Sequence, residues 1–185
     1  RADLVVANIS GNNMSVFLAR PGGGFNGPVT YATGVQPLSV ASLDYNQDGL
    51  LDVVVANGSS NTISLFPGDG RGAFGARTDI ATGTGPRTLA VGDLNGDALA
   101  DVVVPNFTSN NVSVFLGNGT GLGARTDFVT ANSPLVVGLG DVTGDAIPDL
   151  VAGSFALNGI SLLTGTGTGS FNPKTDILTG TNPRA

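Results

Sequence analysis

The sequence predicts an all-β protein built from repeated four-stranded antiparallel sheets, and three observations lead to this prediction. Glycine supplies 29 of the 185 residues, in short clusters that separate apolar segments. All 14 acidic residues are aspartate, which favours turns and caps, and the chain lacks glutamate, which favours helices. Similar apolar segments return at intervals of about 49 residues, which indicates an internal repeat.

The composition also excludes several classes of protein. A net charge of -6 argues against nucleic acid as a partner, since nucleic-acid binding needs a basic surface. No apolar run approaches the 18 residues of a membrane span, so we expect no membrane insertion. Without cysteine or histidine, the chain has no disulfide, no Cys/His zinc site and no cysteine nucleophile.

Each repeat opens with an aspartate followed by an apolar strand. The opening aspartates Asp3, Asp52 and Asp101 are 49 residues apart, and Asp149 follows Asp101 after 48. Val, Ile, Leu and Phe dominate the segments, and Gly, Asn, Asp and Pro separate them, which is typical of short strands and turns. The opening strands are expected at 3–8, 52–57, 101–106 and 149–154.

Three further strands are expected in each repeat. A second group lies at 14–18, 63–66, 112–116 and 160–163. A third group, after a Gly-rich turn, lies at 28–32, 77–81, 125–129 and 174–178. A fourth group lies at 38–43, 89–94 and 135–139.

Four strands in about 49 residues is the size of one β-propeller blade. One blade cannot bury both of its faces, so neighbouring blades must supply the core. We therefore predict a single partial β-propeller domain over residues 1–185, with about four blades and forming part or half of a larger propeller. The repeats are placed at approximately 3–51, 52–100, 101–148 and 149–185.

The two ends of the chain align with the interior of the repeat. Residues 1–3 align with 99–101, and residues 182–184 align with 85–87, so about ten residues are missing from the fourth repeat. Three arrangements follow from this: a fragment of a longer propeller, half of a propeller completed by a second copy, or one unit of a head-to-tail assembly. Open blade edges invite strand pairing, so a solitary monomer is disfavoured.

Three loops between the fourth strand of one repeat and the first strand of the next share one spacing of oxygen-bearing side chains. Residues 44–52 read D-x-N-x-D-G-x-x-D, and residues 93–101 and 141–149 repeat the pattern. Loop positions 1, 3, 5 and 9 can converge on one cation. These candidate ligands are Asp44, Asn46, Asp48 and Asp52; Asp93, Asn95, Asp97 and Asp101; and Asp141, Thr143, Asp145 and Asp149.

Calcium is the cation that suits these loops, because Ca²⁺ takes six to eight hard oxygen ligands in a flexible geometry. Up to three structural Ca²⁺ sites are predicted, and Mg²⁺ fits less well because it retains more water. The alternative is that the loop side chains only make Asx-turns at strand ends. Ala98 and Ala146 replace the glycine of the first loop at position 6, where a left-handed backbone is expected.

The loop pattern and its neighbouring Phe-Gly turns resemble the FG-GAP repeat, also described as a VCBS-type repeat. The turns lie at 24–25, 73–76 and 170–171, whereas the third repeat departs at 122–124. This family is best known from the integrin α-subunit propeller and occurs in bacterial surface proteins and some fungal lectins. The resemblance implies propeller blades, a structural Ca²⁺ in each loop, and an extracellular or cell-surface location. It identifies no ligand.

The leading functional hypothesis is a calcium-stabilised binding or adhesion module for protein or carbohydrate partners. Catalysis is not expected, because histidine, cysteine and glutamate are absent and most aspartates lie in the loops. The competing hypothesis is a structural spacer or self-assembling scaffold. A homo-oligomer, or the remainder of a larger propeller, is expected as a further partner.

Two recurring polar elements are weaker candidates for ligand contact. A basic-Thr-Asp element occurs at 77–79, 125–127 and 174–176 on the predicted outermost strand. Its favoured interpretation is an edge strand protected by charge. Asn8, Asn57 and Asn106 recur at one blade position, and hydrogen bonding at the strand end is the favoured role for them.

Overall fold

The computed structural model describes residues 2–181, which form fifteen β-strands. The first sheet contains β1 (Leu4–Asn8), β2 (Asn13–Phe17) and β3 (Val29–Ala32). The second contains β4 (Pro37–Leu43), β5 (Asp52–Asn57), β6 (Thr62–Phe66) and β7 (Thr78–Ala81). The third contains β8 (Ala90–Gly92), β9 (Asp101–Asn106), β10 (Asn111–Phe115) and β11 (Thr126–Val129). The fourth contains β12 (Pro134–Gly140), β13 (Asp149–Ser154), β14 (Gly159–Leu163) and β15 (Thr175–Leu178).

Each four-stranded sheet is an antiparallel meander in which every strand pairs with its neighbours in the chain. The sheets are offset from the sequence repeats by one strand, because the last strand of one repeat becomes the first strand of the next sheet. Among residues 2–181, the first sheet therefore has three strands, and β1 has no partner at the position that β4, β8 and β12 occupy.

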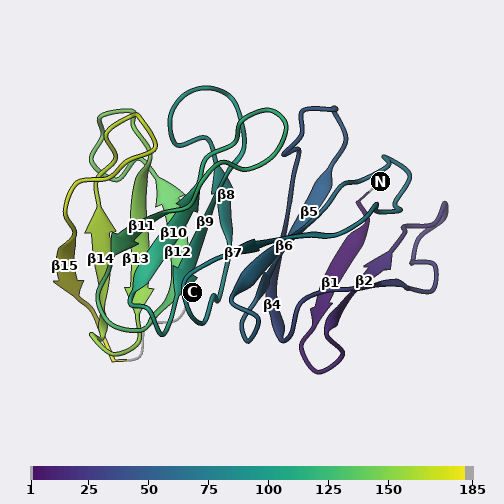
Figure 1. The fold of residues 1–185 in the computed structure, drawn as a ribbon, viewed down its shortest axis with the longest axis horizontal. Coiled ribbons are helices and arrows are strands. Elements are labelled where there is room, and N and C mark those ends of the chain that lie inside the picture. The colour runs from purple at the N-terminus through teal and green to yellow at the C-terminus, as the bar shows by residue number, and fades with distance from the viewer. Residues whose placement is uncertain (1, 182–185) are drawn as a thin grey trace.

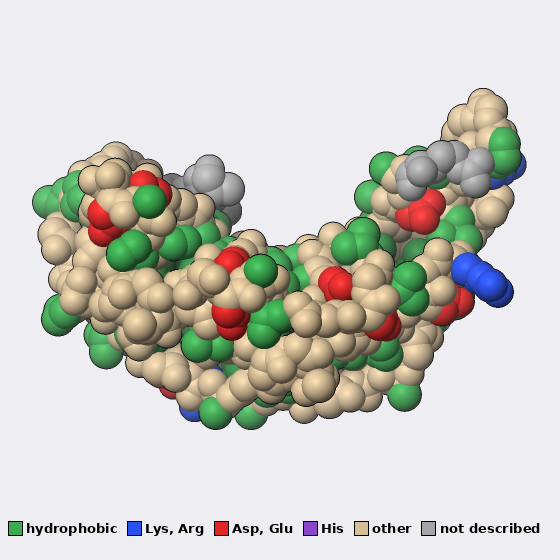
Figure 2. All heavy atoms as spheres, turned by 90° about the horizontal axis from the view of Figure 1, so that it is seen from above, with side chains coloured by type: hydrophobic (Ala, Val, Ile, Leu, Met, Phe, Trp, Pro, Cys, Tyr) green, Lys and Arg blue, Asp and Glu red, His purple; other side chains and the backbone are tan. Residues whose placement is uncertain are grey.

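The sheets follow one another face to face along a curved molecule (Figure 1). Figure 2, seen at right angles to that view, shows one side of the molecule hollowed between two arms. This arrangement confirms the prediction of all-β propeller blades, and the sheets of residues 2–181 do not close into a ring, as expected for a partial propeller. No helix in residues 2–181 is suited to cross a membrane.

Three apolar clusters fill the spaces between consecutive sheets. Met14 of the first sheet packs with Val53, Val55 and Phe66 of the second. Val54 and Ile63, on the opposite face of the second sheet, pack with the third, and a third cluster joins the third and fourth sheets. Because β5 and β9 are covered on both faces, every residue in both strands is buried. Their continuous apolar runs follow from this position.

The expected strands are all present, with one shortened. The segment expected at 89–94 forms only β8, Ala90–Gly92. A β-bulge near the start of β4 and of β12 shifts the register of those strands. At the corresponding place before β8, only an isolated bridge joins Pro86 to Asn106. Pro37 and Pro134 stand at the same place in β4 and β12, so this proline does not explain the shortening. In the partner strand β9, however, Pro105 replaces Ala56 of β5 and Gly153 of β13, and proline has no N–H to extend the ladder. The alignment of residues 182–184 lies outside the described residues.

Candidate functional site

The three aspartate loops connect the first two strands of the second, third and fourth sheets. Their position-9 aspartates, Asp52, Asp101 and Asp149, are fully buried. Asp52 accepts hydrogen bonds from the backbone N–H of Tyr45 at 3.1 Å and of Gly68 at 2.7 Å. The other two loops repeat this pattern. Position 9 therefore ties the loop to the turn that follows the sheet's third strand, a structural role that the sequence alone did not reveal.

Positions 1, 3 and 5 are drawn together by hydrogen bonds within each loop. In the first loop, Asp44 accepts from Gly49 N–H at 3.0 Å and Asp48 accepts from Leu50 N–H at 2.8 Å. The Asn46 amide donates to the Asp48 carboxylate at 3.0 Å. The second loop has the same three contacts. In the third loop, Thr143 instead makes its contact through its backbone N–H, which donates to the position-9 carboxylate. Asx-turns are thus present in all three loops.

Position 6 has a left-handed backbone in all three loops. The φ angle is 79° at Gly49, 65° at Ala98 and 67° at Ala146. Glycine adopts this conformation readily, whereas alanine is strained there by about 1–2 kcal/mol. A strained backbone persists only where its surroundings enforce it, and such strain is concentrated at functional sites.

Burial and like charge act on the position-9 carboxylates. Burial raises the pKa of Asp52, and the charges of Asp48 and Asp44 raise it further, against two backbone hydrogen bonds that lower it. Burial is also the main cause of the raised pKa of Asp101. Burial acts to raise the pKa of Asp149 as well, but hydrogen bonds from the protein outweigh it and lower that pKa. A nearby cation would favour the ionised form in the first two loops.

The first loop has one feature that fits a cation. Asp44 Oδ1 is buried and has no hydrogen-bond partner, which is costly for a carboxylate oxygen. Within the described part of the chain, no three acidic side chains come together in an arrangement that could hold a metal ion. Amide, hydroxyl or backbone oxygens, such as Asn46 Oδ1, would have to complete the coordination shell around Asp44 and Asp48.

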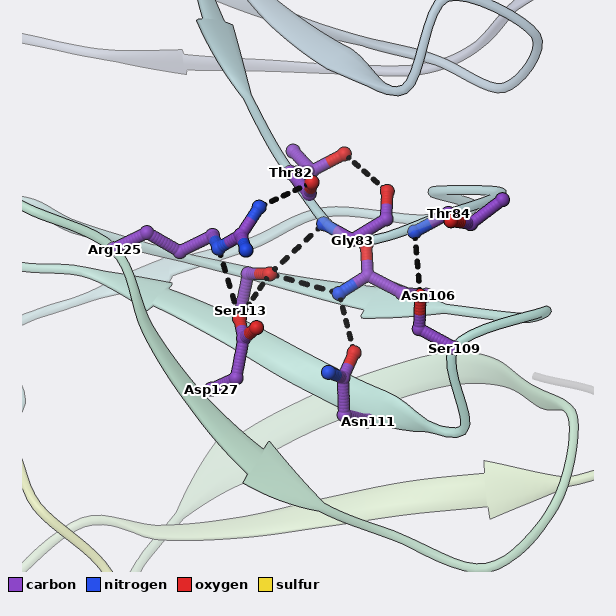
Figure 3. Close-up of polar contacts among 9 residues, drawn as sticks. All are labelled: Thr82, Gly83, Thr84, Asn106, Ser109, Asn111, Ser113, Arg125 and Asp127. Atoms are coloured by element: carbon purple, nitrogen blue, oxygen red, sulfur yellow. Dashed lines mark hydrogen bonds and ion pairs between the residues drawn. The ribbon is translucent and has the colours of Figure 1, made fainter.

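A second recurring polar group crosses from each sheet to the one before it. In the third sheet, the Ser113 hydroxyl donates to Asp127 at 2.8 Å and accepts from the Asn106 amide at 2.8 Å. Arg125 pairs with Asp127 at 3.2 Å and donates to the carbonyl of Thr82, which lies beyond the second sheet's last strand (Figure 3). The carboxylate fixes the direction of the whole chain of hydrogen bonds, because it can only accept.

The second sheet repeats this group. Ser64 donates to Asp79 at 2.6 Å, Asp79 pairs with Arg77 at 3.1 Å, and Arg77 donates to the carbonyl of Ala32 in the first sheet. The basic-Thr-Asp element therefore lies on the outer edge strand, as expected, and also links consecutive sheets. The recurrence of serine at 15, 64, 113 and 161 was the available signal for this link.

The recurring asparagines pack beneath a glycine of the preceding sheet's last turn. A Cβ added to Gly83 would lie 2.7 Å from Asn106 Cγ, and one added to Gly34 would lie 2.7 Å from Asn57 Cγ. At the third junction Ala131 replaces the glycine, and the smaller Ser154 replaces the asparagine. The two positions thus change together, as steric complementarity requires. The asparagines act as buried hydrogen-bonding groups, which confirms the favoured role.

The same group in the fourth sheet predicts a dependence of stability on pH. Burial acts to raise the pKa of Asp176, but hydrogen bonds from Lys174 and Ser161 outweigh it and lower that pKa. The stabilisation from the ionised carboxylate is therefore complete above the ordinary aspartate pKa, about 3.9, and is lost as the pH falls through the lowered value. Urea unfolding of the wild type and of Asp176→Asn should differ by at most about 1 kcal/mol at pH 7. This difference in the free energy of unfolding should shrink towards pH 3. An equal difference at both pH values would show that the ionised Asp176 carboxylate is not the source of the stabilisation.

A cleft of about 670 Å³ lies between the first and second sheets. Val40, Ala41 and Ser42 of β4 line it, at the place where the first sheet has no strand beside β1. Leu18 and Phe74 contribute further apolar surface. Its volume is within the range of small-molecule sites, which combine an apolar lining with a few polar groups.

Polar groups of the cleft come from the turn between β6 and β7. Asp69 Oδ1 accepts from the backbone N–H of Arg71 at 2.8 Å and of Ala73 at 2.9 Å, and these bonds lower the pKa of Asp69. Phe74 is held in place by Tyr31, whose ring lies edge-on at 5.5 Å. The cleft therefore presents an ionised hydrogen-bond acceptor next to an oriented aromatic ring. Sequence analysis did not identify it.

Comparison with protein families gives one match. The family model described as FG-GAP-like repeat matches residues 1–55 and 44–104, two overlapping stretches that together cover more than half of the chain. A search of curated protein sequences gives no match.

Several solved structures share the fold. A functionally unknown protein from Desulfotomaculum acetoxidans matches with a TM-score of 0.67 and 16% identity, over 95% of this chain and 57% of that one. BBS1N, solved in complex with ARL6DN, matches with a TM-score of 0.68 and 13% identity, over 98% of this chain and 53% of that one. An Agrocybe aegerita lectin that recognises non-reducing terminal N-acetylglucosamine matches with a TM-score of 0.61 and 22% identity. This match covers 89% of this chain and 48% of the lectin chain. The chain thus spans about half the length of these structures.

Proposed function

Because this chain belongs to the FG-GAP-like repeat family, we propose that it is a non-catalytic binding module, stabilised by calcium, for a carbohydrate or protein ligand outside the cell. The observation that carries the proposal is the cleft between the first and second sheets. Its concave shape and its volume of about 670 Å³ favour a saccharide over a flat protein surface.

The lining of the cleft suits a saccharide chemically. Carboxylate oxygens accept hydrogen bonds from sugar hydroxyls, and Asp3 and Asp69 supply such oxygens. Leu18, Leu50 and Phe74 provide apolar surface for the carbon face of a sugar ring. The Agrocybe aegerita lectin, which shares the fold, recognises a terminal sugar, and this lends support to the same ligand class here.

Calcium would be held by loop positions 1, 3 and 5, with position 9 anchoring each loop. When bound, the ion would neutralise the clustered carboxylates and hold each loop in its strained conformation. The neutral hydroxyl of Thr143 should weaken the third site. Backbone strain does not rank the loops, because each has one non-glycine residue with a left-handed backbone: Gln47, Ala98 and Ala146. Weak calcium sites are occupied only where calcium is abundant, which supports an extracellular location.

A glycan array followed by calorimetry tests the proposed ligand. We expect saturable binding of a saccharide that Asp69→Ala abolishes. Thr166 occupies the equivalent turn of the fourth sheet, away from the cleft, so Thr166→Ala should bind like the wild type. The bound saccharide should be recovered unchanged, since no catalysis is proposed. Absence of saturable binding, or equal binding by both variants, would refute a saccharide site at the cleft.

A further inference from the structure

The two end sheets expose opposite halves of one interface. We call the side of a sheet that meets the preceding sheet its back face, and the side that meets the following sheet its front face. On the second sheet, the back face carries Val53 and Val55, both buried against the first sheet. On the first sheet the equivalent residues, Leu4 and Val6, are 45% and 36% exposed.

Two aromatic residues extend the uncovered back face of the first sheet. Phe17 and Phe25 occupy the positions of Phe66 and Phe74 in the second sheet. They form the same kind of edge-to-face contact that aromatic pairs make inside the core, with ring centroids 6.4 Å apart. Phe25 is nevertheless 41% exposed, whereas its equivalent Phe74 is half-buried, and Phe17 is half-buried, whereas its equivalent Phe66 is buried. The first sheet therefore presents a preformed apolar surface on which no other part of residues 2–181 packs.

The fourth sheet leaves the complementary front face uncovered. In the third sheet the front-face residues Val103, Val112 and Val114 are fully buried. The corresponding residues of the fourth sheet include Ile160, which is only half-buried, and Ile177, which is 44% exposed. Exposed apolar surface of this extent commonly marks an interaction site.

The glycine–asparagine contact shows which two surfaces match. A Thr-Gly or Thr-Ala pair follows the last strand of each of the four sheets, at 33–34, 82–83, 130–131 and 179–180, and the asparagine or serine position recurs once per sheet, at 8, 57, 106 and 154. Two pairs form within the chain, Gly34 with Asn57 and Gly83 with Asn106. At the third junction Ser154 donates to the carbonyl of Asn132, the residue after Ala131. The members left over are Gly180, after the fourth sheet, and Asn8, in the first. A Cβ added to Gly180 would meet no atom of the described residues within 4 Å.

We propose that the front face of the fourth sheet docks on the back face of the first sheet of a second copy of this chain. This contact continues the interface that already joins consecutive sheets three times within the molecule. Glycine meets asparagine across it, as in the first two internal junctions. The two faces lie at opposite ends of the curved stack of sheets (Figures 1 and 2), and in the proposed assembly two such contacts close a two-copy ring.

The contact lacks one element of the internal junctions. Pro28 stands in the first sheet where Arg77 and Arg125 stand in the second and third. No guanidinium can therefore reach back from the first sheet to a carbonyl of the other copy. Apolar burial and the Gly180–Asn8 contact carry the association, and it should be weaker than the packing within one chain.

Sedimentation of the 185-residue chain tests the proposal. We expect a species close to twice the 18.4 kDa of one chain. Val6→Asp on the back face and Ile177→Asp on the front face should each give monomers, because each removes one half of both contacts. Both positions are exposed in one chain, so folding should persist, as circular dichroism would verify. Val129→Asp, at an exposed position of the third sheet, should leave the dimer intact.

Mixing the two monomeric variants provides the decisive measurement. Val6→Asp retains an intact front face and Ile177→Asp an intact back face, so together they should form a heterodimer through one contact. A wild-type chain that stays monomeric would overturn the proposal, as would a single variant that still dimerises alone. Failure of the mixture to associate, or growth of the wild type into ever larger species with concentration, would also exclude the two-copy ring.

Cross-linking tests the register separately. Because the chain has no cysteine, single substitutions can bond only between copies. An oxidised mixture of Asn8→Cys and Gly180→Cys should give a covalent dimer, whereas Asn118→Cys mixed with Gly180→Cys should not. Equal cross-linking of the two mixtures would overturn the proposed register.

Discussion

Replacing Gly83 by alanine should lower the free energy of unfolding by about 1–3 kcal/mol, the usual cost of overpacking a filled interior. The added Cβ would lie 2.7 Å from both Cγ and Nδ2 of Asn106. Asn106 cannot move aside easily, because it is fully buried and its amide is hydrogen-bonded to Asn111 and Ser113. The backbone of Gly83 is not left-handed, so the loss would come from contact between the two sheets and not from backbone strain.

The matched test is the pair found at the third junction. Gly83→Ala combined with Asn106→Ser recreates the combination of Ala131 and Ser154. Asn106→Ser alone removes two hydrogen bonds and leaves a small cavity, so it should also be destabilising. Urea unfolding of the wild type, the two single variants and the double variant gives the free energy of coupling between the two substitutions. This coupling should be favourable, by about 0.5–3 kcal/mol. Strict additivity would show that the glycine and the asparagine are not matched to each other.

Adding Ca²⁺ to the metal-free protein should raise its melting temperature, and a chelator should reverse the change. An ion bound only by the folded state adds about 2.7 kcal/mol to stability at 100 times its dissociation constant. The first loop should contribute most, because Asp44 Oδ1 is buried without a partner. Magnesium should stabilise less, since it dehydrates reluctantly.

A pair of aspartate variants distinguishes site binding from general screening of negative charge. Asp44→Asn removes one charge from the first loop and should reduce the response to calcium. Asp69→Asn removes one charge outside the loops and should leave that response unchanged. Thermal melts of both variants with and without calcium supply the comparison. Equal responses, or no response in the wild type, would count against calcium sites in the loops.

Most of the fold could be predicted from the sequence because its signals are local. Strands such as Asp52–Asn57 are runs of β-branched residues bounded by turn residues, and the spacing of 49 and 48 residues reveals the repeat. The left-handed backbone at Ala98 and Ala146 was also predictable, since Gly49 occupies the same loop position. Pattern and propensity determine these features within a few residues of chain.

The sequence could not assign the polar residues to partners. Ser113 looked like one member of an alternating strand, yet its hydroxyl links Asn106 to Asp127, and through Arg125 the link extends to the preceding sheet. Asp52 looked like the last ligand of a loop, yet both of its carboxylate oxygens hold backbone amides. Such contacts join residues many positions apart and exist only once the sheets are stacked.

By itself, the sequence determined the repeat, the strands, the aspartate loops and the all-β propeller class. Only the tertiary structure decided which faces meet, because the offset of one strand between repeat and sheet is set by packing and leaves no mark on the spacing. Within residues 2–181, that offset leaves β1 paired on one side only, opens the cleft beside β4, and exposes complementary apolar faces on the first and fourth sheets.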